Sequence, residues 1–349
     1  MNPRVLTAVA AGSGVIRREQ LLDLGLSPAD IRAQVAAGEL IRLRRGVFTT
    51  GEHWTALDEY VGRPLLLARA AVTTMRRGWV LSHDSSAHAW ELPILRPNDP
   101  LVHVTRPGFT NAWTEYRVRH HLARFSPSQV GWVQGLPALD LPRTAVDIAR
   151  ERGVVDGVVA CDAAMQRGVT RLDLEAAYAI MTCWPGVRWA REAVALADPG
   201  AETVHESLTR LLVLEAGIGE PDTQFPVRTT EGIKWCDIRV GNHIVEAHGM
   251  IKLRPVADGG VATRPADEVA RDQWKRERLL RDQGLGTSNV YWEDHWGARR
   301  AVAIERLRRD AAETAALRGA VLDERLARDA ERIRREYGDR RRARPSPVM

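Results

Sequence analysis

A short β-hairpin near residue 240 is the segment that most constrains the fold of this chain. The sequence CDIRVGNHIVEAH contains two runs rich in β-branched residues, joined by Gly241 and Asn242. A two-residue turn of this composition between such runs predicts a hairpin. Counting back along both strands from this turn places Asp237 directly opposite Glu246. Like charges at opposed positions of an antiparallel pair are destabilising, so we expect a divalent metal ion or a neighbouring cationic side chain to compensate them.

The hairpin lies within a series of elements that alternate in a defined order. The predicted neighbours are a helix at 202–215, a strand at 224–227, a basic helix at 267–283 and a strand at 289–292. Together these segments give the order helix, strand, strand, strand, helix, strand. Glu206 lies on the first helix, while Asp237 and Glu246 lie on the hairpin.

This order and its acids resemble the PD-(D/E)xK restriction-endonuclease-like core. The segments ESLTRLLVLEAGI, TQFPV, CDIRV, IVEAHG, WKRERLLRDQGL and VYWED are similar to short nuclease domains related to very-short-patch-repair enzymes. The resemblance implies a metal-dependent DNA endonuclease that uses Mg²⁺ or Mn²⁺, with Glu206, Asp237 and Glu246 as metal ligands. Mg²⁺ prefers carboxylate oxygens, and a divalent ion can activate water against a phosphodiester. A solvated acidic face on an edge strand is the alternative.

The chain departs from the nuclease pattern two residues after Glu246. The pattern has a lysine there, and close relatives generally have Asp followed by Gly, whereas this chain has His248. A histidine can act as a general base or a metal ligand, and it can also mark a site that has lost its activity. Lys252 and Lys275 are candidates for a displaced catalytic lysine, and Arg278 for a phosphate contact. The chain has only three lysines, all between residues 234 and 275.

The N-terminal segment predicts a DNA-binding module. Apolar residues over 15–25 favour a short helix, and Ser27 with Pro28 and Asp30 begins a second one. Residues 40–44 and 47–49 alternate like two strands around Arg45-Gly46. Helix, turn, helix and β-ribbon together describe a winged helix, which places one helix in the major groove of DNA. A module used only for protein contacts is the alternative. The predicted DNA-binding residues are Arg32 and Gln34 on the second helix and Arg42, Arg44 and Arg45 on the wing.

This segment, GVIRREQLLDLGLSPADIRAQVAAGELIRLRRGVF, resembles the N-terminal winged helix of AbiEi-family antitoxins. The resemblance continues through WVLSHDSSAHAWELPI, LVHVTRPGF, YRVRHHLA and GLPALDLPRTAVDIAR, the order of a winged helix followed by a mixed α/β domain. It implies a DNA-binding autoregulator paired with a nucleotidyltransferase toxin. A non-catalytic repressor with a degenerate nuclease fold is therefore the alternative to an active endonuclease.

The histidines of the middle region could be taken for a catalytic triad or a metal site. Ser82, His83 and Asp84 are adjacent, but consecutive side chains do not converge as a catalytic triad does, so we expect Ser82 or Asp84 to cap the following helix. His120 and His121 with His103 have metal-ligand chemistry but no supporting carboxylate or cysteine spacing. We therefore interpret them as strand histidines.

Composition fits a multi-domain α+β protein that acts on an anionic partner. The chain has 349 residues and a net charge of +5, which favours DNA or another anionic partner. Its three widely spaced cysteines suit a reducing cytoplasm, and because it has no run of about 18 apolar residues, no membrane association is expected. An interrupted apolar stripe at Leu317, Val321, Leu322 and Leu326 could be used for homodimerisation. The predicted division is a winged helix at 1–55, a mixed α/β domain at 56–150, a helical linker at 151–199, a nuclease-like domain at 200–310 and a basic helical tail at 311–349.

Overall fold

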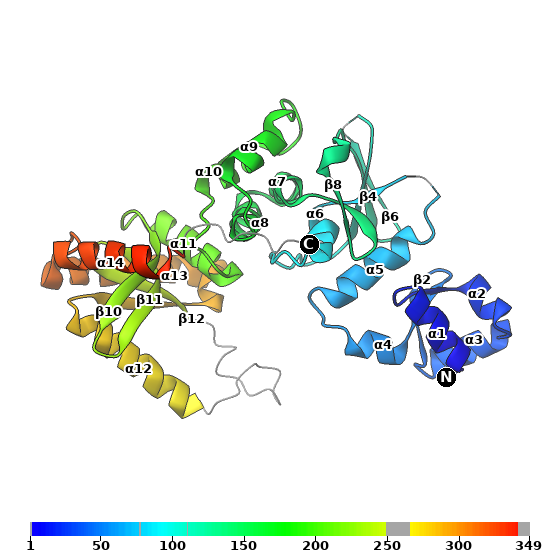
Figure 1. The fold of residues 1–349 in the computed structure, drawn as a ribbon, viewed down its shortest axis with the longest axis horizontal. Helices are drawn as coiled ribbons and strands as arrows, with labels where there is room; N and C mark the ends of the chain where they lie inside the picture. The colour runs from blue at the N-terminus through cyan, green and yellow to red at the C-terminus, as the bar shows by residue number, and fades with distance from the viewer. Residues whose placement is uncertain (1, 77, 110, 249–265, 341–349) are drawn as a thin grey trace. The chain divides into compact units, whose positions relative to one another are not determined.

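The computed structural model describes residues 2–76, 78–109, 111–248 and 266–340 (Figure 1). Within these residues the chain forms fourteen α-helices and three β-sheets, which confirms the predicted α+β, multi-domain class. The chain divides into two compact units. Unit 1 comprises Met1–Gly153 and Leu174–Arg191, and unit 2 comprises Val154–Asp173 and Glu192–Met349. The finer five-part division stays a prediction.

Unit 1 begins with a small helical module that carries a three-stranded sheet. Its elements are α1 (Pro3–Ala11), β1 (Ile16–Arg17), α2 (Arg18–Asp23), α3 (Pro28–Ala36), β2 (Leu40–Arg44), β3 (Val47–Thr50) and α4 (Gly51–Ala56). The predicted cap of α3 is present: Ser27 Oγ accepts from the Asp30 N–H at 3.2 Å, and Asp30 Oδ2 accepts from the Ser27 N–H at 2.8 Å. The helix predicted over 15–25 is wrong at its start, because Ile16 pairs with Phe48 of β3 and begins a strand.

The rest of unit 1 is built on a six-stranded mixed sheet of order β6-β7-β5-β4-β9-β8. Its elements are α5 (Gly62–Val72), β4 (Val80–Leu81), α6 (His83–Ala89), β5 (Val102–Arg106), β6 (Asn111–Glu115), β7 (Val118–Leu122), β8 (Val130–Val133), β9 (Leu136–Leu139) and α7 (Leu141–Arg152). Leu65 and Ala68 of α5 pack on Leu81, Val104 and Ala138 of the sheet. Arg143, which is fully buried, pairs with Asp147 within α7 at 2.8 Å.

The start of α6 differs from the predicted capping arrangement. Ser82 is the N-cap residue, but its side chain makes no capping hydrogen bond. Its Oγ instead lies 3.0 Å from His83 Nδ1. Asp84 pairs with Arg152 of α7 at 3.1 Å. These contacts tie α6 to its neighbours, so neither Ser82 nor Asp84 fulfils the expected capping role through its side chain.

Three helices follow in the sequence: α8 (Val154–Gln166), α9 (Arg171–Ala179) and α10 (Val187–Leu196). Of these, α8 lies in unit 2, where its Asp162 pairs with Arg210 at 3.1 Å. This buried pair joins α8 to the helix that carries Glu206.

Unit 2 contains the helix–strand–strand–strand–helix–strand order that the sequence predicts. Its elements are α11 (Val204–Ala216), β10 (Asp222–Thr229), β11 (Gly232–Val240), β12 (His243–His248), α12 (Ala266–Asp282), β13 (Gly286–Tyr291), α13 (Gly297–Arg318) and α14 (Glu324–Tyr337). The sheet order is β10-β11-β12-β13, with antiparallel neighbours except for the parallel pair β12 and β13. Val240 pairs with His243 across Gly241 and Asn242, which confirms the predicted hairpin. Gly241 has a φ of +55°, which a glycine adopts without strain.

Helices pack on this sheet through two separate cores. One joins α11 and α13 to β11, β12 and β13 through residues such as Leu212, Val245 and Leu307. The other joins α12 and α14 to β10, β11 and β12 and includes Ile244 and Leu326. Because the adjacent residues Ile244 and Val245 belong to different cores, both faces of β12 are covered.

The C-terminal apolar stripe does not form one exposed surface, as dimerisation through it would need. Leu326 is 4% exposed and packs within unit 2, with Leu322 against the same core. Leu317 and Val321 are 74% and 83% exposed. Half of the predicted dimer surface is therefore intramolecular core. Among the helices that the structure describes, none combines the length and apolar character needed to cross a membrane.

Candidate nucleic-acid interface and acidic site

The structure brings the three predicted acids of unit 2 together. Glu206 lies in the first turn of α11, Asp237 on β11 and Glu246 on β12. Extending the hairpin register by one residue beyond the pair of Ile238 with Val245 places Asp237 opposite Glu246. Glu206 and Glu246 are each 9% exposed. The acids therefore converge in a poorly solvated place, as the sequence predicts.

Burial and mutual repulsion change the protonation of these acids. Burial and then the Asp237 carboxylate raise the pKa of Glu206 to about 7. The same two causes, in the same order, raise the pKa of Glu246 to about 8, although Arg276 opposes the change. At neutral pH the site therefore holds protons that a solvated glutamate would have lost.

A cationic side chain compensates the opposed acids, which is one of the two expected solutions. Arg276 of α12 donates to Glu246 Oε1 at 2.9 Å and also to the Trp235 carbonyl oxygen. Asp237 Oδ2 accepts from the Ala247 N–H at 2.8 Å. The Arg276 guanidinium and the retained protons together relieve the repulsion within the hairpin.

Glu206 is held by a network of its own. Its Oε1 accepts from the Thr203 hydroxyl at 2.9 Å, and its Oε2 accepts from the Glu202 N–H at 2.9 Å and from Gln224 Nε2 at 3.1 Å. Gln224 is 4% exposed and has a φ of +48°. A non-glycine residue in that region is strained, and here the strained residue delivers a donor to Glu206.

The observed arrangement of the acids is not a metal cage. Where the structure describes the chain, the three side chains whose ligand atoms all lie within 4.8 Å of one another are His83, His103 and His121, in unit 1. The acids have the chemistry that Mg²⁺ and Mn²⁺ prefer. However, a divalent ion at Glu246 would have to displace Arg276 and a proton, so the side chains do not fit the ion as they stand.

The other residues predicted for the nuclease site lie elsewhere or outside the description. His248 ends β12 and is half-buried, with its ring edge-on to Tyr291 at 5.7 Å. Lys275 is exposed and its Nζ lies 2.8 Å from Glu231 Oε1, in a pair that does not include the three acids. Arg278 is exposed on α12. Lys252 lies outside the described residues.

The predicted DNA-binding residues lie mainly on the surface of the N-terminal module. Arg32 is exposed on α3, where Gln34 is half-buried. Arg42 of β2 and Arg45 of the following turn are exposed. Arg44 is half-buried and lines a cavity. The wing that joins β2 to β3 therefore presents Arg42 and Arg45, and Arg44 faces inward.

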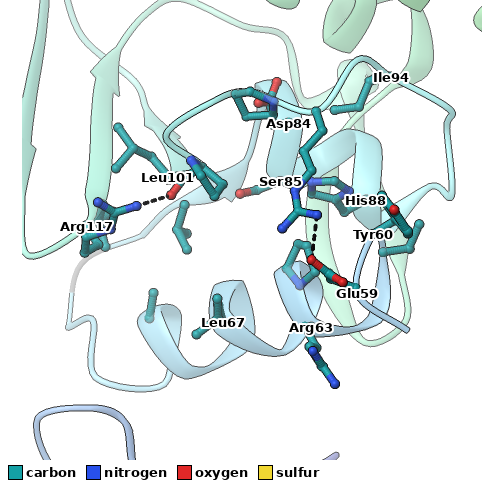
Figure 2. A pocket seen from close by; sticks show the side chains of 18 of the residues that line it. Glu59, Tyr60, Arg63, Leu67, Asp84, Ser85, His88, Ile94, Leu101 and Arg117 are labelled. Carbon is teal, nitrogen blue, oxygen red and sulfur yellow. Dashed lines mark hydrogen bonds and ion pairs between the residues drawn. The ribbon is translucent and has the colours of Figure 1, made fainter. Parts of the chain in front are cut away.

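That cavity has a volume of about 680 Å³ and belongs to unit 1 (Figure 2). The ion pair between Arg96 and Glu59, at 2.7 Å, lies at its wall, together with Tyr60 and Ile94. It does not coincide with the acids of unit 2. We assign it no ligand, because its apolar lining and scattered charges select no particular chemistry.

Sequence reasoning missed two residues that complete the acidic site. Arg276 lies in a basic helix of many arginines, next to the candidate Lys275, and nothing in the local sequence distinguishes it from them. Gln224 begins the predicted strand at 224–227, and nothing in the local pattern indicates its positive φ. The only signal for Arg276 was the charge imbalance of the hairpin, which called for a cation without specifying which one.

Comparison with known proteins agrees with the interpretation of the first module. The chain is 28% identical over 209 residues to an uncharacterized protein of Mycobacterium tuberculosis, Rv2248 in strain H37Rv and MT2308 in strain CDC 1551. The match covers 58% of this chain and 70% of the relative. The crystal structure of the RV2827C protein from the same species is 18% identical with a TM-score of 0.36, and covers 56% of this chain and 78% of the other. Residues 3–50 match the family model of the AbiEi antitoxin transcriptional regulators.

Proposed function

We propose that this protein is a DNA-binding transcriptional regulator of the antitoxin type, which contacts DNA through its N-terminal winged helix. The observation that carries the proposal is that helix α3 and the wing both present exposed arginines. Both elements lie in the segment that matches the AbiEi regulators. Arg32 lies on the helix, and Arg42 and Arg45 lie on the wing.

The wing and helix α3 contribute differently to DNA binding. Arginines on a wing contact phosphates, which supplies affinity without regard to sequence. Side chains on a helix in the major groove contact base edges, which supplies sequence preference. Arg32 and Gln34 therefore read bases in this proposal, and Arg42 and Arg45 hold the backbone.

The wing is tested by replacing Arg42 and Arg45 with alanine together. Losing two phosphate contacts is expected to weaken binding about tenfold or more at moderate salt, and to reduce the slope of log K against log salt by about two. Fluorescence anisotropy of labelled duplex DNA, titrated with the full chain over a salt series, measures both quantities.

The matched control replaces two exposed arginines of unit 2, Arg299 and Arg335, with alanine. This variant has the same net charge as the wing variant, so a general charge effect would weaken both equally. Equal salt slopes for the two variants would place the contact outside the wing and contradict the proposal.

An antitoxin acts on a toxin, so the proposal also includes a protein partner. We propose a nucleotidyltransferase toxin as this partner, and co-purification of the full chain with the product of a neighbouring gene tests the pairing. Homodimerisation stays a prediction, for which the stripe offers only the exposed Leu317 and Val321.

A second candidate function is metal-dependent cleavage of DNA by unit 2. The observation that favours it is the convergence of Glu206, Asp237 and Glu246 with two strongly raised pKa values, a pattern that is typical of functional sites. Asp237 and Glu246 would hold Mg²⁺ or Mn²⁺ only after the Arg276 guanidinium leaves Glu246, and the ion would then supply charge stabilisation at phosphorus. Ion binding requires loss of the Glu246 proton, so cleavage in this candidate is stronger at pH 8.5 than at pH 6.5.

Plasmid nicking tests this candidate without reference to the winged helix. Wild type, Asp237→Asn and the exposed control Asp282→Asn are each incubated with supercoiled DNA and Mg²⁺ or Mn²⁺ at both pH values. The candidate requires nicking by wild type and by the control, and at least a hundredfold loss in Asp237→Asn, the order expected when a group essential to the transition state is removed. Absence of nicking by wild type with either ion would reject it and leave the regulator as the sole function.

A further inference from the structure

We propose that His83, His103 and His121 of unit 1 form a binding site for a divalent transition-metal ion, and that Zn²⁺ is the preferred ion. The three side chains are 2%, 7% and 6% exposed. Each offers one ligand atom, and these atoms all lie within 4.8 Å of one another. The site is separate from the acids of unit 2 and from the DNA-binding surface.

Three neighbouring elements of the sheet bring the rings together. His103 lies on β5 and His121 on β7, which pair in parallel so that Thr105 is opposite His121. His83 begins α6 directly after β4, and the Ser82 N–H donates to the His103 carbonyl oxygen at 3.2 Å. Residues from three separate stretches of sequence therefore meet, which explains why sequence spacing did not indicate the trio.

Two of the ligand nitrogens already lie close together. His103 Nδ1 and His121 Nε2 are 3.0 Å apart and share a hydrogen bond, whose proton would move to the other nitrogen of its ring when both bind an ion. Two nitrogens bound to one tetrahedral Zn²⁺ at 2.0–2.1 Å lie roughly 3.3 Å apart. The widest separation in the trio exceeds that value by at most about 1.5 Å. His83 stacks on His121 with ring centroids 4.0 Å apart and planes 17° apart, so its ring has to turn out of this stack before Nε2 points at a shared ion.

One ring nitrogen of the trio has no hydrogen-bond partner among the residues that the structure describes. His83 Nδ1 lies 3.0 Å from Ser82 Oγ, whereas His83 Nε2 is buried and makes no hydrogen bond. His83 also has a φ of +49°, a strained conformation for a residue with a β-carbon. A buried unsatisfied group calls for an explanation, and a metal ion at Nε2 supplies one. In that arrangement the Ser82 hydroxyl accepts from Nδ1–H and fixes the ring, as partners of ligating histidines commonly do.

Burial also keeps the three rings in the form that binds metal. Burial is the first cause of a lowered pKa at His83, His103 and His121, and the neighbouring histidines and arginines lower it further at His83 and His121. A neutral imidazole has a free lone pair, which a protonated one lacks. Three neutral imidazoles select Zn²⁺, Co²⁺ or Ni²⁺ over Mg²⁺ or Ca²⁺, which prefer oxygen.

Charges around the trio limit the expected affinity. Four arginines lie nearby, and each pairs with an acid; the pairs are Arg119 with Glu151, Arg143 and Arg150 with Asp147, and Arg152 with Asp84. Three acids do not fully offset four arginines, so the surroundings are slightly cationic. We expect weaker binding than at a site whose ligands are thiolates, and a structural role that pins α6 to β5 and β7.

Cobalt and zinc titrations of the full chain test the site. The protein is treated with a chelator, desalted and titrated with Co²⁺, and the expected result is about one tetrahedral Co²⁺ per chain, seen as intense visible absorption that Zn²⁺ then abolishes. Excess Zn²⁺ is expected to raise the melting temperature of unit 1 by roughly 5 °C. Mg²⁺ at the same concentration should leave it unchanged.

Matched variants assign the ligands. His83→Gln and His121→Gln should each lose the cobalt spectrum and the zinc-induced thermal shift. His120→Gln is the control, because His120 neighbours His121 on β7 but stacks on Trp113 at 4.9 Å. Circular dichroism of each variant checks folding. Absence of a cobalt spectrum and of a zinc shift in wild type, or equal binding by His83→Gln, His121→Gln and wild type, would overturn the proposal whatever the variants' stability.

Discussion

Replacing Arg210 with methionine is expected to lower the free energy of unfolding of unit 2 by about 3–5 kcal/mol, the range for breaking a buried ion pair. Arg210 is 3% exposed and pairs with Asp162, which is fully buried. Burial raises the pKa of Asp162 to about 6, and Arg210 opposes that rise. Without Arg210 the carboxyl takes up a proton more readily, so the loss should be larger at pH 8 than at pH 5.

Hydrogen exchange measures this loss in the right part of the molecule. A chain of two units need not unfold in one step, so amides of α8 and α11 report on the pair better than a global melting curve does. The exposed pair of Arg328 with Glu324 provides the control, since Arg328→Met should change stability by less than ~0.5 kcal/mol. A change below about 1 kcal/mol for Arg210→Met would show that the pair does not hold α11 in place.

Replacing Arg276 with methionine is expected to make unit 2 increasingly unstable as the pH rises. The glutamates explain the sign. Their folded pKa values, about 7 for Glu206 and about 8 for Glu246, are above the unfolded values. The stabilisation that such groups give the folded state is fully present below pH ~4.5 and is lost as the pH rises through 7 and 8. Because Arg276 restrains the pKa of Glu246, its removal extends the loss to higher pH.

The size of this effect depends on pH. Near pH 6, Arg276→Met should lower the free energy of unfolding of unit 2 by about 1 kcal/mol, because the hydrogen bonds to Glu246 and the Trp235 carbonyl are lost. At pH 9 the cost should reach about 2–3 kcal/mol, since each further unit of pKa rise adds ~1.4 kcal/mol. Denaturant unfolding followed across this pH range gives both values.

Two variants separate the charge effect from general loss of an arginine. Arg278→Met, on the same helix but exposed, should match wild type at every pH. Glu246→Gln should flatten the fall in stability between pH 6 and pH 9, because one titrating group is gone. A pH-independent cost for Arg276→Met would mean that Arg276 does not neutralise the hairpin acids.

The parts of unit 2 that the sequence predicted are those set by local chemistry. The turn at Gly241 and Asn242 fixes the hairpin register, and the register alone makes Asp237 and Glu246 neighbours. The element order then brings Glu206 to them. In unit 1 the same is true of the Ser27 cap, whose two hydrogen bonds join residues three positions apart.

The parts that could not be predicted depend on contacts between distant segments. Arg276 reaches Glu246 across 30 positions, and His83 meets His121 across 38. Spacing in the sequence carries no information about such meetings, which require the sheet order. Ile16 illustrates a third failure: its apolar pattern suits a helix, but pairing with β3 made it a strand, because tertiary contacts override weak local preference.

Selection of DNA from a random library by the full chain tests the central claim most directly. Wild type and two variants, Arg32→Ala/Gln34→Ala and Arg42→Ala/Arg45→Ala, are each carried through the same rounds, and the enriched sequences are compared. A winged-helix regulator predicts one enriched motif for wild type, the same motif at lower affinity for the wing variant, and loss of the motif for the α3 variant. No enriched motif for wild type, or the same motif from the α3 variant at wild-type affinity, would contradict it.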